Sequence, residues 1–314
     1  MSKSENIKER KKTSIGGSAV IEGVMMRGPR ISAMAVRKPD GTMDCSQWPT
    51  GNGRKPWYKT TPFVRGVFNF IDSMKASYSC LMRSAEISGM DDEEPSPFEQ
   101  KLRKALGDKF TAFFNAVAAV LGIALAVVLF VALPTALIGL LRKFITSRFL
   151  LSLAEAVTKI GIFVAYIWLI GLMPDIRRTF EYHGAEHKTI ACYEAGEELT
   201  VENVRKHIRF HPRCGTSFIL IVLIVSALVF SFVSWNSVGI RILLKFACLP
   251  IVIGIAYEII KLAGRSDNPI MRAVSQPGLW LQRLTTREPD DSQIECAIAA
   301  MLPCIPENSD EDRW

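Results

Sequence analysis

Four long apolar segments constrain this chain more than any other feature of its sequence. They cover residues 112–141, 149–173, 216–235 and 242–263. Crossing the hydrocarbon core of a bilayer takes about 20 predominantly apolar residues, and each segment reaches that length. We therefore expect an α+β integral membrane protein with about four transmembrane helices, whose polar portion lies between and beside them.

Lysine and arginine residues indicate the orientation of these segments. The connection between the second and third segments, residues 175–215, is rich in them, whereas the two other connections are short and carry few. The regions before the first segment and after the last are also basic. Basic residues remain on the cytoplasmic side, so both termini and the 175–215 loop are expected to face the cytoplasm, with the chain in the inner membrane.

The net charge of +7 fits this topology better than it fits a nucleic-acid partner, since no DNA- or RNA-binding motif is present. The seven cysteines are odd in number and scattered, which favours a reducing compartment over a disulfide framework. The N-terminal residues are basic and polar and lead into no apolar core, so no signal peptide is expected.

Residues 1–111 are predicted to form a cytoplasmic α+β region. Its strand-like stretches, separated by the turn sequence Lys38-Pro-Asp-Gly41, predict a β-meander over Ser18–Cys45. Apolar residues at helical spacing then run from Val67 to Ala85. This helix is expected to pack its apolar face on the sheet, or alternatively to lie along the membrane surface.

The remaining chain divides into two predicted regions. Residues 112–264 hold the four-helix transmembrane region together with the 175–215 loop, and Glu155 and Lys159 are expected to pair at i,i+4 in the second span. Residues 265–314 form a cytoplasmic tail with a turn at Gln276-Pro-Gly278. A short helix capped by Thr286 is expected to begin near Pro289.

Every histidine of the chain falls in the 175–215 loop, at positions His183, His187, His207 and His211. The pattern H-x-x-E-H places His183 and His187 on one side of a helix, where both can reach the same ion. Glu186 then stands where a carboxylate can accept a proton from water at that ion. Pro212 removes His211 from a helix, so His211 and Cys214 form an H-x-x-C pair.

We predict a divalent metal, zinc above all, held by His183, His187, His211 and Cys214. Four protein ligands would close the site and make it structural, whereas three would leave a position open for chemistry, with Glu186 as the catalytic base. Two alternatives remain: the histidines simply lie near the headgroups, or Glu186 only orients a histidine ligand. The H-x-x-E-H order also occurs in inverzincin peptidases, which makes Glu258 a candidate further ligand.

Four sequence strings together resemble the YqhQ family of bacterial multi-pass membrane proteins. They are GGSAVIEGVMMRGP, HGAEHKTI, HPRCGTSF and QPGLWLQRLTTREPDD, and the likeness extends from about Ile15 to Met301. The resemblance implies a predicted metal-dependent enzyme of unknown specific role. It also makes Glu22 and Arg27, in the first string, candidate site residues, and His207 of the loop is a further candidate from its residue type alone.

The function expected from these observations is metal-dependent hydrolysis at the cytoplasmic membrane surface. A site so close to the bilayer suits a membrane peptide or a lipid headgroup as substrate. The alternative is a non-catalytic scaffold or biogenesis factor, in which a structural metal ties the loop together and the N-terminal region docks a membrane-protein partner. Ion transport is a third option, disfavoured by the few polar residues within the spans.

Overall fold

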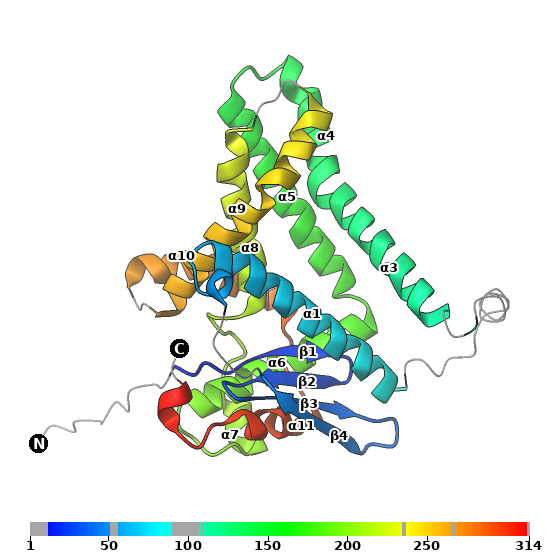
Figure 1. Ribbon diagram of the computed structural model, residues 1–314, viewed down its shortest axis with the longest axis vertical. Coiled ribbons are helices and arrows are strands. Elements are labelled where there is room, and N and C mark those ends of the chain that lie inside the picture. Colours follow the sequence, from blue (N-terminus) through cyan, green and yellow to red (C-terminus); the bar gives the residue numbers. More distant parts are fainter. Residues whose placement is uncertain are drawn as a thin grey trace, which may run out of the picture. The chain divides into compact units, whose positions relative to one another are not determined.

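The computed structural model describes residues 12–50, 56–89, 107, 110–233, 237–265 and 268–312 (Figure 1). Within them the fold is α+β, as predicted, with one small antiparallel sheet and many helices. The chain divides into two compact units, and each draws on distant stretches of sequence. The first unit comprises Met1–Gly89, Ile167–Ile221 and Ile253–Trp314, and the second comprises Met90–Tyr166 and Val222–Val252.

The sheet of the first unit is the β-meander that the sequence predicts. Each strand pairs with the next along the chain, in the order β1-β2-β3-β4, and all pairs are antiparallel. The predicted turn is present, since Gly41 has a φ of 83° and its amide donates to the Lys38 carbonyl. The strands are β1 (Gly16–Val20), β2 (Gly23–Arg27), β3 (Ile31–Arg37) and β4 (Met43–Pro49).

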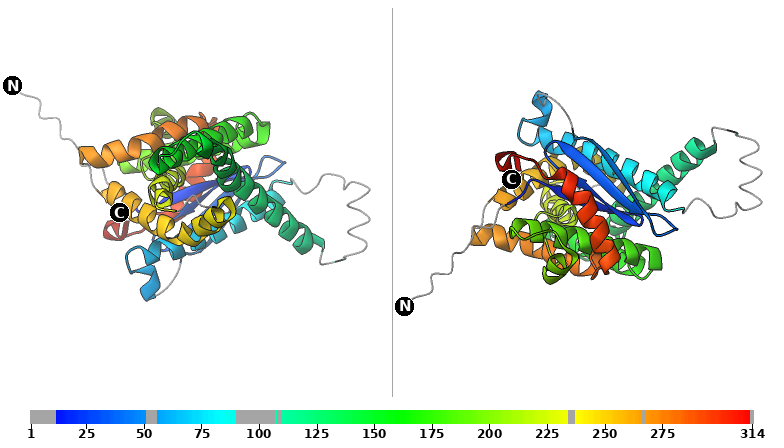
Figure 2. Two further views of the ribbon diagram at one scale, coloured as in Figure 1. Left: turned by 90° about the horizontal axis from the view of Figure 1, so that it is seen from above. Right: turned by 90° about the horizontal axis from the view of Figure 1, so that it is seen from below.

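Alternate residues of a strand point to opposite sides of the sheet, and the two inner strands, β2 and β3, have buried residues on both sides. Met26 and Ala35 lie in the larger core, with residues of helices α6 (Pro174–Glu194) and α11 (Asp291–Met301). Met25 and Met34 lie in a smaller core on the other face, which includes Cys80 of helix α1 (Val64–Ile87). Figure 1 and the right-hand view of Figure 2 show α11 beside the strands. The sheet therefore forms the middle layer of the first unit.

Helix α1 exists where the periodicity predicts it, but its apolar side does not pack on the sheet. Its buried residues are Gly66, Cys80 and Ser84. Ile71 and Tyr78, from the apolar side, are 41% and 50% exposed. The expectation of a packed apolar face is therefore wrong: small residues let the helix approach its neighbours, and the large side chains point outward.

Two details of the C-terminal tail also differ from expectation. The predicted turn at Gln276–Gly278 lies inside helix α10 (Pro269–Thr285). Thr286 ends that helix rather than capping the next one. Helix α11 is capped by Asp290, whose carboxylate accepts from the Gln293 amide while the Gln293 side chain accepts from the Asp290 amide. This reciprocal capping box satisfies two backbone amides at the start of the helix, so it is a stronger signal for a helix start than Thr286 alone.

Among the described residues, three helical stretches are long and apolar enough to cross a membrane: Phe113–Leu140, Phe149–Ile170 and Gly239–Gly264. The first stretch combines helices α3 (Phe110–Val127) and α4 (Leu133–Leu140), which the short π-helix η4 (Val128–Ala132) joins. The second belongs to α5 (Arg148–Ile170) and the third to α9 (Val238–Arg265). The fourth predicted span is α8 (Gly215–Ser231), an apolar helix of 17 residues and hence shorter than the other three.

The charged residues of the second unit pair differently from the prediction. The Glu155 carboxylate contacts Arg241 at 2.9 Å and also Lys245, both from α9. Lys159 instead donates to the Ser226 hydroxyl at 3.3 Å. The expected pair of Glu155 with Lys159 is thus replaced, because α9 brings two cations to the same carboxylate. Charges this deeply buried require such partners.

Candidate metal centre

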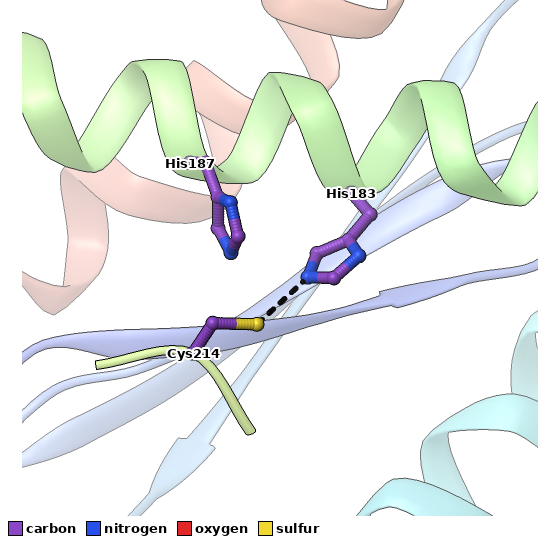
Figure 3. A group of neighbouring side chains, drawn as sticks. All are labelled: His183, His187 and Cys214. Atoms are coloured by element: carbon purple, nitrogen blue, oxygen red, sulfur yellow. Dashed lines mark hydrogen bonds between the residues drawn. The ribbon is translucent and has the colours of Figure 1, made fainter. Parts of the chain in front are cut away.

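Three potential metal ligands from two distant parts of the chain converge in the first unit. His183 and His187 project from the same side of α6 toward Cys214, which immediately precedes α8 (Figure 3). Their donor atoms all lie within 4.8 Å of one another, and Nε2 of His183 is 3.2 Å from Sγ of Cys214. Ligand atoms around one tetrahedral zinc ion are about 3.3–3.7 Å apart, so small side-chain shifts suffice to bind one.

Backbone carbonyls fix the tautomer of both histidines. Nδ1 of His183 lies 2.8 Å from the Thr285 carbonyl oxygen, and Nδ1 of His187 lies 2.6 Å from the Arg209 carbonyl oxygen. A carbonyl oxygen only accepts, so each Nδ1 carries a hydrogen and each ring directs its Nε2 toward Cys214 (Figure 3). A second partner that orients the ring in this way accompanies most metal-binding histidines.

The surroundings of Cys214 favour its thiolate. The Thr216 amide lies 3.4 Å and the Thr216 hydroxyl 3.2 Å from Sγ, at the start of a helix where backbone N–H groups stabilise negative charge. Burial raises the pKa of Cys214, but His183 and His187 lower that pKa to well below its ordinary value. Conversely, burial lowers the pKa of His183, while Cys214, Glu186 and the Thr285 carbonyl raise it to about 9. The thiol is therefore ready to act as an anionic ligand.

Glu186 lies buried between the ligand helix and strand β1. The Gly17 backbone lies against its carboxylate, and Glu186 is 4% exposed. Burial raises the pKa of this carboxyl, and the charges of His183 and His187 oppose the rise. A Cβ atom at Gly17 would stand 2.7 Å from the Met25 carbonyl oxygen and 3.0 Å from Cδ of Glu186. Glycine is thus required for the strand to reach the carboxylate.

Two atoms of this group stand out because they are buried without a hydrogen-bond partner among the described residues. They are Nε2 of His187 and Oε2 of Glu186. Leaving such an atom buried and unpaired costs about 1–3 kcal/mol. A cation bound by the three donors would contact the free lone pair of His187 directly. The donor set, two imidazoles and a thiolate, also suits zinc, so the residues present fit the predicted ion.

His211 lies beside this group without joining the three donors. Its ring centroid is 5.6 Å from that of His187, but its Nε2 faces Arg213 at 3.2 Å and Glu194 at 3.7 Å. Burial lowers the pKa of His211, so its ring is held neutral although Glu194 opposes the shift. Of the H-x-x-C pair, Cys214 is therefore the residue that faces both ligand histidines.

Gln282 of α10 holds the turn that carries His211 and Cys214. Its side-chain oxygen accepts from the His211 amide at 2.8 Å, and its nitrogen donates to the His211 carbonyl at 2.7 Å. The same nitrogen lies 3.2 Å from the Ser217 hydroxyl, against which Gly278 packs closely. One buried amide thus holds the His211 backbone and contacts the Ser217 side chain, on either side of Cys214.

A second close approach places the Thr285 carbonyl. The Arg287 backbone crosses α6 at Gly184, where an added Cβ would stand 1.9 Å from the Arg287 carbonyl oxygen. The Arg287 amide donates to the Phe180 carbonyl at 2.8 Å. Gly184 therefore sits between the two ligand histidines because the segment after α10 needs that space. All four sequence strings singled out above contribute to this one site.

The other candidate residues lie elsewhere. Glu22, at a φ of 51° in the β1–β2 turn, binds Arg178 through both carboxylate oxygens and accepts from the Tyr182 hydroxyl, so it fastens the hairpin to α6. Arg27 ends β2 with an exposed side chain. Glu258 forms an ion pair with Arg65 of α1 and accepts from the Phe63 amide. None of the three residues lies in the donor group.

His207 belongs to a second cluster of possible ligands, with Cys192 and Glu197. There the polar atoms already have partners: His207 Nε2 lies 3.1 Å from Glu197, and the Cys192 thiol donates to the Glu198 carbonyl at 3.6 Å. Burial also raises the pKa of Cys192 to about 11. No side-chain nitrogen or oxygen of this cluster is buried without a hydrogen-bond partner, in contrast to Nε2 of His187.

Sequence reasoning missed the groups that position the ligands. The carbonyls of Arg209 and Thr285 belong to the backbone, which carries no signal in the residue type. Gly17 and Gly184 do carry one, since a glycine inside a strand or helix often marks a close approach.

Comparisons with known proteins agree with the resemblance noted above. A family model described as "Protein of unknown function (DUF1385)" matches residues 61–307. The chain is similar to "Uncharacterized protein YqhQ" of Bacillus subtilis (strain 168), with 36% identity over 286 residues, which cover 90% of this chain and 89% of that protein. No solved structure matches the chain.

Proposed function

The chain belongs to the YqhQ family, and we propose that it is a metal-dependent hydrolase of the cytoplasmic membrane. One observation supports this most: His183, His187 and Cys214 present three converging donors, with an unpaired Glu186 oxygen beside them. Three protein ligands are typical of catalytic zinc sites, which keep one position open, whereas structural sites usually have four. His211 is close enough to matter but is already engaged by Arg213 and Glu194.

The residues divide the work in this proposal. A zinc-like ion held by the three donors supplies Lewis acidity, which polarises a carbonyl or phosphoryl oxygen and makes water more acidic. Glu186 takes up a proton at Oε2 and later delivers it to the leaving group. Burial raises the pKa of this carboxyl toward the working pH of the cell, so that the group can both accept and release a proton there. The Thr285 and Arg209 carbonyls keep both imidazoles oriented.

Three long apolar helices and the basic residues around them support the proposed membrane location. We propose that α8 completes a four-span bundle and that both termini, with the 175–215 loop, face the cytoplasm. The proposed substrate is then amphiphilic, either a membrane peptide or a lipid with a hydrolysable headgroup.

A non-catalytic scaffold with a structural metal is the second candidate, and the depth of the site favours it. His187 is 1% exposed, Glu186 4% and Cys214 8%. In that case the ion only joins α6 to the start of α8, and the chain docks a membrane-protein partner.

The substitution Glu186→Gln distinguishes these two functions. Membranes from cells that lack the chain are incubated with purified wild-type or variant protein, and their lipids and peptides are compared by mass spectrometry. A hydrolase is expected to generate new products in the wild-type sample only, while both proteins retain the metal. If the variant yields the same products, or the wild type yields none, Glu186 has no catalytic role and the scaffold is favoured.

A further inference from the structure

The amphipathic character of α1 is inverted with respect to a helix of a water-soluble protein. The side toward the rest of the first unit carries small residues, among them Gly66, Cys80 and Ser84. The opposite side carries large apolar residues that are 36–50% exposed, and we call it the outer stripe of α1: Val64, Phe68, Ile71, Met74, Tyr78 and Leu81. Small residues at helix contacts with large apolar residues outside are typical of helices surrounded by lipid.

The start of α1 packs directly on α9, one of the helices long enough to cross a membrane. A Cβ at Gly66 would stand 3.1 Å from Cα of Gly254, and a Cβ at Gly254 would stand 2.7 Å from the Phe63 carbonyl oxygen. The Asn69 amide also donates to the Tyr257 hydroxyl at 3.0 Å. Backbones this close leave no room for a side chain between them, so α1 is attached to the span itself.

The depth of this attachment can be read from α9. Gly254 lies ten residues before Gly264, the end of the apolar stretch, which corresponds to about 15 Å along a helix. The 26-residue stretch is about 39 Å long and exceeds a hydrocarbon core of about 30 Å. One turn nearer Gly264, Glu258 binds Arg65, and such a charge pair suits the headgroup level. The outer stripe therefore begins at the boundary between headgroups and acyl chains.

We propose that α1 lies in the cytoplasmic leaflet, with its outer stripe immersed in lipid. The partner is the bilayer itself, because the stripe continues the apolar surface of the span to which α1 is attached. Amphipathic helices that lie in the plane of a membrane bury their apolar face about 5–10 Å deep. The inference rests on the membrane location proposed above, but not on hydrolysis. It places the sheet, and the metal centre on its other side, immediately below the membrane surface.

Site-specific photo-crosslinking in native membranes tests this placement. Benzoylphenylalanine is introduced into the full chain, one position at a time, at Ile71 and Tyr78 of the outer stripe. Leu121, 64% exposed in the apolar stretch of α3, is the lipid-facing reference, and Glu202, exposed on α7 (Val201–Lys206), is the reference for water. After irradiation, the mass of the intact protein identifies any adduct.

The expected result is a mass increase of one phospholipid at Ile71, Tyr78 and Leu121, and none at Glu202. A lipid adduct at Leu121 together with none at Ile71 and Tyr78 would overturn the inference while leaving the membrane location intact. An adduct of protein at the two α1 positions would also overturn it, since a partner or a second copy would then cover the stripe. If Leu121 itself gives no lipid adduct, the membrane location fails as well.

Discussion

At the scale of single residues, His183, His187 and Cys214 are the proposed ligands of the ion. We predict that Cys214→Ser lowers metal affinity by more than about 100-fold, since outer partners alone are worth 10–100-fold and Cys214 is a direct ligand. His211→Ala is predicted to lower it by less than about tenfold, because the His211 ring faces Arg213 and Glu194. Competition titration against a chelator measures both, and equal losses would make His211 a fourth ligand.

The sequence predicts the ligand types well and their grouping only in part. The spacing of His183 and His187 on a helix follows from 3.6 residues per turn, and the structure has that helix. Nothing in the spacing of His211 and Cys214 indicates which of the two turns toward α6. In the structure Cys214 is the one that faces the two histidines, and Gln282, from a helix some 70 residues later, holds the backbone of the turn at His211.

At the scale of elements, the site exists because segments approach one another at glycines. Gly184→Ala is predicted to destabilise the first unit by about 3 kcal/mol, since the new methyl group would collide with the Arg287 backbone rather than with a movable side chain. We also expect Gly184→Ala to lose metal, because the collision would displace the Thr285 carbonyl, which orients His183.

Gly215→Ala is the matched control for this substitution. Gly215 follows Cys214 directly, and a Cβ there meets no atom within 4 Å. Thermal unfolding and metal content of both purified variants are compared with the wild type. Normal values for Gly184→Ala, or equal damage in both variants, would contradict the close packing of α6 against the segment after α10.

The start of α11 provides a pH-dependent prediction at the same scale. Burial raises the pKa of Asp290, but hydrogen bonds from Ser292 and the Gln293 amide lower it to below its ordinary value. A lowered folded pKa stabilises the protein above about pH 3.9, and the contribution is lost as the pH falls through the folded pKa. Asp290→Ala is therefore expected to cost about 1 kcal/mol at pH 7 and progressively less in acid.

Thermal unfolding between pH 7 and pH 3 checks the role of Asp290, with Glu198→Ala, at an exposed position just before α7, as the control. A cost of Asp290→Ala that does not change with pH would show that the carboxylate is not the cap. The predicted position of this helix is correct, but its predicted cap, Thr286, is not. Thr286 and Asp290 are both residue types that cap helices and lie within five positions of each other, so the sequence alone does not separate them.

Other elements show where pattern-based prediction succeeds and where it fails. The β-meander was predictable, since the strands pair in chain order through short turns. The packing of α1 was not, because a periodicity of apolar residues locates a face without saying whether protein or lipid covers it. The same limit applies to Glu155, whose partners come from a helix about 90 residues away.

At the scale of the whole molecule, the orientation in the membrane has a direct test. Cys45 is exposed on β4, whereas the other six cysteines are buried or half-buried. If the N-terminal region is cytoplasmic, a membrane-impermeant maleimide is expected to label the chain only after spheroplasts are opened. Loss of that label in Cys45→Ser confirms the position. Labelling of Cys45 in intact spheroplasts would place the sheet outside the cell and refute the proposed topology.

The central claim is that imidazole nitrogen and thiolate sulfur from two distant segments bind one ion. X-ray absorption at the zinc edge, on protein purified in detergent with its native metal, tests it most directly. The account predicts about one zinc per chain, with nitrogen neighbours at about 2.0–2.1 Å and a single sulfur at about 2.3 Å that disappears in Cys214→Ser. Protein without stoichiometric metal, or a spectrum with no sulfur neighbour, would contradict the account.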